Sequence, residues 1–254
     1  MSIVRERHDH VEVVRIDRPE AKNAVNDEVA LGLEAALDSI EADDDVRVVV
    51  ITGTGDTFSA GADLKMIAAG RSKEFHTKRG GFAGFVERDF PKPIIAAVNG
   101  TALAGGFEIV LTCDLVVSAD TAIFGLFEVK RGLIAAAGGL IRLPRKIPQN
   151  LAMEIAIAGT TIDAKRLHEL GLVNRIVPAR EVVETAVALG AQIAENAPLA
   201  VRRSRSLVRE ALDLDQAAAW KRSKELQREV FAHPDATEGS TAFAEKRAPI
   251  WTST

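Results

Sequence analysis

The stretch PKPIIAAVNGTALAGGFEIVLTCDLVVSADTAIFGLFEV, residues 91–129, decides the fold class. Two prolines precede a short apolar run at Ile94–Val98, which predicts a buried strand. A glycine-rich turn leads into an expected helix over about Gly105–Thr112, and further strands are expected near Leu115–Ser118 and Ala122–Gly125. The repeat of strand, loop and short helix predicts a layered α/β spiral.

The residues before this stretch show the same alternation of strand and helix. Val11–Ile16 alternates in the manner of a strand, and Asn26–Ala42 places apolar residues at helical spacing, with Asn26 as the expected N-cap. Val46–Thr52 is a β-branched run that is followed by Gly53-Thr54-Gly55, as a strand ending in a loop would be. Strand, helix and strand in this order predict a parallel crossover unit.

The last part of the chain, from residue 138 on, is mainly helical in pattern, apart from one short strand signal at Leu172–Val177. A proline-containing turn at residues 196–198 separates two long expected helices. The last helix has an expected N-cap at Asp235, with Glu238 at capping-box spacing. A second, mainly helical region is therefore expected.

The composition limits the classes of function. The 254 residues are 47% hydrophobic, which is enough for a sizeable core. The 36 acidic and 32 basic side chains give a net charge of -4, without the positive field expected of a nucleic-acid-binding protein. The charged start MSIVRERHDHVEVVRI is unlike a secretory signal, and Ile94–Ala119 is too interrupted for a membrane span, so a cytoplasmic location is expected. The single cysteine, Cys113, excludes an intrachain disulfide and a cysteine-rich zinc site.

Two glycine-rich loops follow expected strands and are candidates for ligand binding: Thr52–Lys65 and Val98–Leu115. The first contains Gly53-x-Gly55, but Phe58 stands at the third glycine position of the dinucleotide fingerprint and no helix pattern opens there. The sequence has no phosphate-loop lysine motif and no GxSxG nucleophile elbow, and its five histidines lack metal-ligand spacing. Dinucleotide binding, nucleophilic triads and zinc hydrolysis are therefore not indicated.

The second loop offers both hydrogen-bond donors and a carboxylate. Ala104-Gly105-Gly106 opens a helix, so free amide groups and the helix dipole would favour an anion or oxyanion there. Glu108 lies on the same face of the first turn, and is either a catalytic group or a glutamate that stabilises the helix N-terminus. Glu128 follows a short expected strand and stands beside two basic residues, which by itself favours a surface ion pair.

Four stretches are informative together: FSAGADLK (58–65), the stretch 91–129, GLVNRIV (171–177) and EGSTAFAEKRAPIW (238–251). In this order they resemble the motifs of the crotonase (enoyl-CoA hydratase/isomerase) superfamily, and the similarity spans essentially the whole chain. The resemblance implies an α/β fold with a spiral core of ββα turns, residues 1–195, followed by a helical region, residues 196–254, that forms trimers, often stacked into hexamers. It also implies acyl-CoA substrates, without a metal or redox cofactor.

The same resemblance implies roles for single residues. It places an oxyanion hole at the backbone amides of Ala62 and Gly105, which would hold the thioester carbonyl as it becomes an enolate. It places the two hydratase carboxylates at Glu108 and Glu128, which favours an enoyl-CoA hydratase or the reverse dehydratase. The alternatives are an isomerase, a carnitinyl-type dehydratase, an acyl-CoA hydrolase, or a non-catalytic relative that binds acyl-CoA or RNA.

The expected contacts to CoA also come from the resemblance. The segment RPEAKNAVN, residues 18–26, is similar to the stretch that meets the adenine, with Lys22 and Ala24 as the expected contacts. Lys65 and, from a neighbouring subunit, Lys246 resemble phosphate-contacting positions. The binding surface is expected to include three more residues of the FSAGADLK motif: Ala60, Asp63 and Leu64.

Two expectations concern the environment of the reaction. Two close carboxylates in a dry pocket repel each other, so we expect the pKa of one of them to be raised. Phe127 and Ala135-Ala136 stand where many relatives carry proline and a Pro-Gly pair, which alters the acyl-pocket wall and favours a branched, sterol-derived or carnitine-type acyl group. Phe82, Phe85 and Phe90 either cover that pocket or pack in the core.

Overall fold

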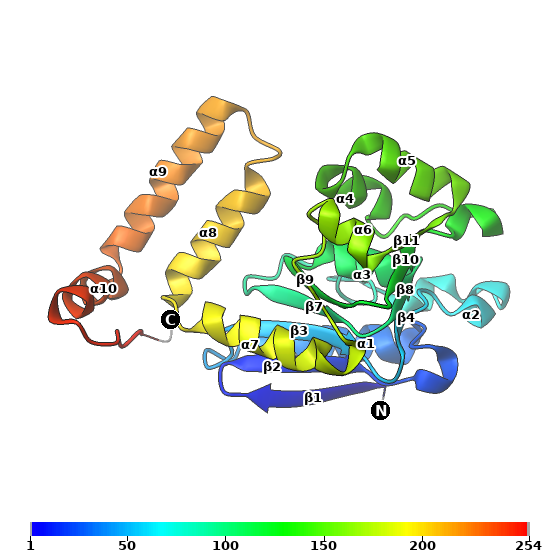
Figure 1. Cartoon of the computed structure of the whole chain (residues 1–254), viewed down its shortest axis with the longest axis horizontal. Helices are drawn as coiled ribbons and strands as arrows, with labels where there is room; N and C mark the ends of the chain where they lie inside the picture. The colour runs from blue at the N-terminus through cyan, green and yellow to red at the C-terminus, as the bar shows by residue number, and fades with distance from the viewer. Residues whose placement is uncertain (1, 253–254) are drawn as a thin grey trace.

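The computed structural model describes residues 2–252 and shows two main β-sheets wrapped by helices, with three C-terminal helices extending from them (Figure 1). Within these residues the larger sheet has the strand order β1-β2-β3-β7-β9-β12. β1 pairs antiparallel with β2, and the other neighbours are parallel. The strands are β1 (Ile3–His8), β2 (Val11–Ile16), β3 (Val48–Gly53), β7 (Ile94–Val98), β9 (Leu115–Ala119) and β12 (Arg175–Val177).

The second sheet is built from short strands in the order β11-β10-β8-β4. β8 runs parallel to both β4 and β10, whereas β11 is antiparallel to β10. Each of β4, β8 and β10 follows a strand of the larger sheet, so the chain alternates between the two sheets, which confirms the predicted α/β spiral. The bounds are β4 (Thr57–Ser59), β8 (Thr101–Leu103), β10 (Ile123–Gly125) and β11 (Thr161–Asp163), and a small hairpin adds β5 (His76–Thr77) and β6 (Gly81–Phe82).

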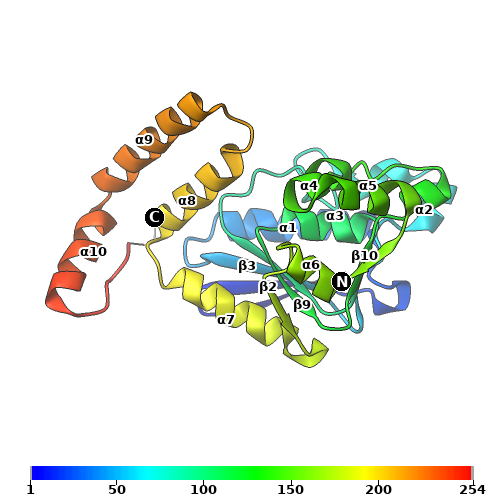
Figure 2. The same cartoon turned by 45° about the horizontal axis from the view of Figure 1, so that its top comes forward.

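Helices cover the two sheets. α1 (Asp27–Glu41) packs on β1 and β2, and the side chain of Asn26 accepts a hydrogen bond from the Val29 amide, as expected of its N-cap. α7 (Val182–Ala194) packs along β2, β3, β7 and β9 (Figure 2). α3 (Gly105–Thr112) is buried over its whole length and lies against β4 and β8. The other helices of the core are α2 (Leu64–Ala68), α4 (Gly139–Lys146), α5 (Gln149–Ala158) and α6 (Ala164–Glu169).

The last three helices, α8 (Pro198–Glu210), α9 (Gln216–Ala232) and α10 (Pro234–Glu245), extend away from the sheets in both views (Figures 1 and 2). We call residues 196–252 the C-terminal arm. Arg205 ties the arm to the core, since its Nε donates to Asp114 Oδ2 at 2.7 Å. Trp251 Nε1 donates to the Glu195 carbonyl at 2.6 Å, which fixes the end of the arm to its base. The division into residues 1–195 and 196–254 stays a prediction, and its last two residues lie outside the described ones.

Six strands within residues 2–252 were not predicted from the sequence: β1, β4, β5, β6, β8 and β11. β4 and β8 lie in the two stretches that were expected to be glycine-rich loops. β1 carries a polar sequence and is exposed over most of its length, so it shows no apolar run, and its pairing with β2 stabilises it. β11 lies in the part of the chain that was predicted to be helical apart from Leu172–Val177. It is an edge strand of three residues held by β10, a long-range partner that no local pattern shows. No helix within residues 2–252 has both the length and the apolar character to cross a membrane.

The predicted capping of α10 is wrong. His233 is the N-cap residue, and its side chain accepts a hydrogen bond from the Asp235 amide. Asp235 is instead buried inside the first turn, where its Oδ1 accepts hydrogen bonds from the amide and hydroxyl of Thr252, both at 2.9 Å. Glu238 forms an ion pair with Arg247 rather than a capping box. Both carboxylates are therefore used by the returning C-terminal segment, which the helix pattern alone does not reveal.

Candidate active site

Two loops that follow strands of the second sheet meet at a pair of glycines. Gly61 follows β4, and Gly105 is the first residue of α3, just after β8. Gly61 has a φ of +86°, and a Cβ added to it would lie 2.7 Å from the Gly105 nitrogen, so this approach requires glycine. Ala104 precedes Gly105 with a φ of +50°, a conformation that residues with a side chain rarely adopt. A strained turn and a glycine contact thus hold the two loops together.

The backbone amides of Ala62 and Gly105 are available to a ligand. Within residues 2–252, neither amide donates a hydrogen bond to another group of the chain. The Val25 amide donates to the Gly61 carbonyl, and the Val25 carbonyl accepts from the Asp63 amide. The amide of Ala62 lies between these two hydrogen bonds and takes part in neither. Unpaired amides at a helix N-terminus and beside it can stabilise an oxygen that gains negative charge. The structure therefore brings together the two amides that the resemblance assigns to an oxyanion hole.

Glu108 is buried on α3, with 3% of its surface exposed. Its Oε1 accepts a hydrogen bond from the Gly139 amide at 2.8 Å, which fixes the carboxylate against the start of α4. The pKa of Glu108 is raised to about 7, mainly by burial and also by the negative charge of Glu128, and the hydrogen bonds to its carboxylate lower it in part. Burying a carboxyl group lowers the stability of the folded chain when the group is ionised. A glutamate that only stabilises a helix terminus would not need to be buried, so the burial of Glu108 favours the catalytic alternative.

Glu128 begins a short 3-10 helix, Glu128–Arg131, just after β10. Within the described residues its Oε2 atom is buried without a hydrogen-bond partner, and burial raises its pKa. The surface ion pair with its basic neighbours is absent among residues 2–252, because Lys130 lies over the Phe127 ring and Arg131 donates to a carbonyl. The expectation that repulsion raises one pKa needs correction: both pKa values are raised, and burial is the larger cause.

A family model described as enoyl-CoA hydratase/isomerase matches residues 6–254. The chain belongs to the enoyl-CoA hydratase/isomerase family. The carnitinyl-CoA dehydratase of Salmonella typhi is 38% identical over 244 residues, which cover 94% of this chain and 93% of the relative. An enoyl-CoA hydratase from Mycobacterium tuberculosis H37Rv is 42% identical, with a TM-score of 0.96 over 100% of this chain and 99% of that one. A carnitinyl-CoA hydratase from Mycobacterium avium is also 42% identical, with a TM-score of 0.76 over 100% and 99% of the two chains.

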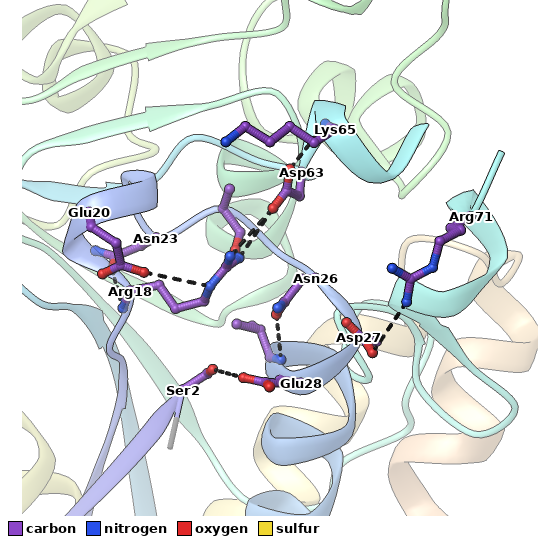
Figure 3. A network of polar contacts seen from close by, with 12 residues as sticks. Ser2, Arg18, Glu20, Asn23, Asn26, Asp27, Glu28, Asp63, Lys65 and Arg71 are labelled. Atoms are coloured by element: carbon purple, nitrogen blue, oxygen red, sulfur yellow. Dashed lines mark hydrogen bonds and ion pairs between the residues drawn. The ribbon is translucent and has the colours of Figure 1, made fainter. Parts of the chain in front are cut away.

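The segment before α1 and the FSAGADLK loop of this family member lie side by side (Figure 3). The Lys22 carbonyl accepts a hydrogen bond from the Ala60 amide at 3.0 Å. Arg18 donates to the Ala24 carbonyl at 2.6 Å, and its guanidinium lies 3.4 Å from the Asp63 carboxylate. The structure thus gathers most of the residues predicted to contact CoA: Lys22, Ala24, Ala60 and Asp63, with Leu64 and Lys65 in the first turn of α2.

Arg18 and Asn23 are positioning residues that the sequence reasoning missed. Asn23 donates to the carbonyls of Thr54 and Thr57 at 2.9 and 2.6 Å, and accepts from the Arg18 amide at 3.0 Å. Asp63 is already engaged, since Arg18 holds one carboxylate oxygen and the Lys65 amide donates to the other (Figure 3). The available signal was the RPEAKNAVN segment itself, which contains both polar residues. A contact between Asp63 and CoA stays a prediction.

Lys246 is the one predicted site residue that a single chain does not bring to the others. It lies at the C-cap of α10 with a φ of +55°, on the arm and away from α2 (Figure 1). A contact between Lys246 and a ligand held at α2 would therefore need a neighbouring subunit, as the resemblance implies, and that contact stays a prediction.

Three further residues shape the surroundings of the carboxylates. Gly139 supplies the amide that binds Glu108, and Arg142 lowers the pKa of Glu108 by its charge while donating to the carbonyls of Ala137 and Val86. Phe82 packs against Gly105, where an added Cβ would lie 2.5 Å from the ring. Phe82, Phe85 and Phe90 are all buried in the hydrophobic core, so each of them packs there, and a role in covering the acyl group stays a prediction. Within residues 2–252, no His, Cys, Asp or Glu cluster could hold a metal ion.

Proposed function

We propose that the chain is a hydro-lyase that adds water across the 2,3-double bond of an enoyl-CoA thioester, or removes it in reverse. One observation carries this proposal. Two buried carboxyl groups with raised pKa values, Glu108 and Glu128, interact electrostatically, and Glu108 lies in the same first turn of α3 as Gly105, whose amide, like that of Ala62, is unpaired within residues 2–252. Membership of the enoyl-CoA hydratase/isomerase family supports the thioester substrate class.

In the proposed reaction, the amides of Ala62 and Gly105 donate hydrogen bonds to the thioester oxygen as it gains charge and becomes an enolate. A single donor of this kind contributes about 2.7–4 kcal/mol to lowering the barrier. One glutamate takes a proton from water as the water oxygen bonds to C3, and the other gives a proton to C2. The pKa of about 7 at Glu108 suits such an exchange, because either protonation state is accessible near neutral pH.

The proposal extends to the CoA subsite and to assembly. We propose that the surface made by Lys22, Ala24, Ala60, Asp63, Leu64 and Lys65 binds CoA, with Lys246 supplied by a neighbouring subunit of a trimer or a dimer of trimers. The exposed apolar residues of the arm, among them Trp220 and Phe231, support an assembled state. Proton transfer and electrostatic stabilisation are sufficient for the reaction, so we propose that neither a metal nor a redox cofactor takes part.

A second candidate is dehydration of carnitinyl-CoA, favoured by the names of the relatives from Salmonella typhi and Mycobacterium avium. The two candidates share the reaction type and differ in the acyl group. A carnitinyl group carries a quaternary ammonium, which would seek an aromatic face. The ammonium of Lys130 already lies 5.0 Å from the centre of the Phe127 ring, beside Glu128. Competition with Lys130 makes an uncharged acyl group our first candidate.

The test is the loss of absorbance of conjugated 2-enoyl-CoA thioesters on adding the protein, across chain lengths and branching, alongside dehydration of carnitinyl-CoA. We expect uncharged enoyl groups to react faster, and Lys130→Ala to raise the relative rate on carnitinyl-CoA. Lys165→Ala, at an exposed lysine of α6, is the matched control. Turnover of carnitinyl-CoA alone would replace the first candidate with the second. No turnover of any of these thioesters would contradict the hydro-lyase proposal.

A further inference from the structure

A cavity of about 320 Å³, open to solvent and lined by both polar and apolar atoms, lies apart from the residues of the thioester site. Its volume is at the lower end of the range found for small-molecule sites. The residues around it come from loops far apart in the sequence. Those on which the inference rests are Gly55, Asp56, Gly100, Thr101, Thr121 and Arg180.

The cavity lies where parallel strands of the larger sheet end. Its residues follow the carboxyl ends of β3, β7, β9 and β12, one loop from each strand. The carboxyl edge of a parallel sheet is where α/β proteins commonly bind ligands. β4, β8 and β10 start near this cavity and lead toward Ala62, Gly105 and Glu128 respectively. These three strands begin at the cavity and end at the thioester site. Each strand is three residues long, so the two sites lie at opposite ends of the strands, separated by roughly 10 Å.

The walls of the cavity are held in place by the chain itself. Asn99 donates from Nδ2 to the Gly55 carbonyl at 2.7 Å, and its Oδ1 accepts from the Gly53 amide at 3.3 Å. Gly100 passes so close to the Asp56 carbonyl that an added Cβ would lie 1.8 Å from its oxygen. The loops after β3 and β7 are therefore locked to each other, and the site needs little rearrangement to receive a ligand.

Several polar groups around this cavity make no hydrogen bond to the described part of the chain, and those of Gly55 and Thr121 are exposed to solvent. Within residues 2–252, the hydroxyls of Thr101 and Thr121 make no hydrogen bond to the chain. In the same described part, the backbone amides of Gly55, Gly100 and Thr121 donate none either. These groups can serve a ligand that offers hydrogen-bond acceptors, such as a carboxylate.

Two of the lining residues are charged, and their charges are opposite. Asp56 accepts a hydrogen bond from the Thr57 hydroxyl at 3.2 Å, and no cation pairs with its carboxylate within residues 2–252. Arg180 lies 3.0 Å from Glu181, but its side chain is 83% exposed, so this surface pair is weak and the guanidinium can turn to a ligand. The cavity thus offers one anionic and one cationic group beside hydroxyls and amides.

We propose that this cavity is a second ligand site, which binds a small zwitterion of the free α-amino acid class. The carboxylate of the ligand lies toward Arg180 and the unpaired amides, and its ammonium lies toward Asp56. The threonine hydroxyls meet a polar side chain of the ligand. Neither charged group belongs to the thioester site, so the proposal is independent of the hydro-lyase assignment.

The experiment is calorimetric titration of the full chain, without any thioester, using three matched probes. L-Glutamine carries both charges, N-acetyl-L-glutamine only the negative one, and L-glutamine amide only the positive one. We expect L-glutamine to bind with a dissociation constant in the millimolar range. Each singly charged probe should bind at least about tenfold more weakly than L-glutamine. No binding of L-glutamine, or equal binding of all three probes, would overturn the proposal.

Two variants locate the binding. Asp56→Asn and Arg180→Gln should each weaken L-glutamine binding about tenfold or more. The control is Arg166→Gln, which removes an exposed arginine that is paired with a neighbouring glutamate in the same manner. Unchanged binding in both Asp56→Asn and Arg180→Gln would place the ligand elsewhere and overturn the assignment. Thermal unfolding verifies that each variant is folded, and the three probes on the unmodified chain test the charge requirement without any variant.

Discussion

The central strands of the core and the C-terminal arm expose their apolar side chains to very different extents. Strands β3 and β7 of the core are buried at every position. On the arm, Trp220, Phe231 and Phe243 are 62%, 70% and 88% exposed. The central strands therefore bury their hydrophobic residues within one chain, whereas the arm presents apolar surface of the kind that marks an interface with another protein surface, as do a few exposed core residues such as Ile134 and Ile157. We expect chemistry to belong to the core of one chain and an assembly contact to belong to the arm, so that variants can separate the two.

The largest expected effect concerns the core. Glu108→Gln and Glu128→Gln should each lower hydration about 100-fold or more, because the amide keeps the shape but cannot exchange the proton. Their effects should be far from additive, since both groups act in one transition state. Steady-state rates measure the loss, and light scattering should show unchanged assembly. Glu154→Gln, at an exposed glutamate of α5, is the control. Near-normal hydration by either single variant would reduce that glutamate to a structural role.

The next effect concerns the arm. Trp220 and Phe231 are eleven residues apart on α9, about three helical turns, so they share one exposed face. The double variant Trp220→Glu/Phe231→Glu should shift the assembly toward single chains, because charge would be buried at an apolar contact. Light scattering measures the mass. Leu31→Glu, at an exposed leucine of α1 in the core, should leave the mass unchanged. A monomeric unmodified chain at working concentrations would contradict the predicted trimer.

A third effect is the pH dependence of stability. The pKa of Glu108 rises from 4.5 to about 7 on folding, so the folded state binds this proton more tightly than the unfolded state. The destabilisation is absent below 4.5, grows as pH rises toward 7, and is constant above it. Glu108→Gln removes this pH-dependent destabilisation. As pH rises from about 4 to about 8, the unfolding free energy of the variant should therefore increase by up to about 3 kcal/mol relative to that of the unmodified chain. Urea unfolding at the two pH values measures the difference. If the difference in unfolding free energy between the two proteins is the same at both pH values, the raised pKa of Glu108 is contradicted.

The smallest expected effect joins the two regions. Lys246→Ala should weaken binding of the acyl-CoA thioester a few-fold and leave kcat unchanged, because an exposed charge pair contributes about 0.2–1 kcal/mol. The effect should disappear in the double variant of α9, in which subunits no longer meet. Titration of acyl-CoA into both proteins measures it. If Lys246→Ala weakens binding equally in the assembled and the dissociated protein, the contact does not come from a neighbouring subunit.

Local patterns predicted the strands of the larger sheet better than the short strands of the second sheet. β7 and α3 lie at the predicted residues, because β-branched and apolar runs bounded by proline and glycine carry their own signal. β1, β4, β8 and β11 were not predicted, since each depends on pairing with a partner that lies far away in the sequence or in the other strand of a hairpin. Asp235 was misplaced for a related reason. Its environment is set by Thr252, seventeen residues later in the chain.

The sequence by itself determined the family, the alternation of strands and helices, and the identity of the groups available for chemistry. Only the tertiary structure decided which amides stay unpaired, as at Ala62 and Gly105, and how far burial raises the pKa of Glu108. It also placed Lys246, at the C-cap of α10, away from α2 within one chain. The physical reason is that residue types and local periodicity are written along the chain, whereas hydrogen-bond partners and loss of water depend on residues that folding brings together.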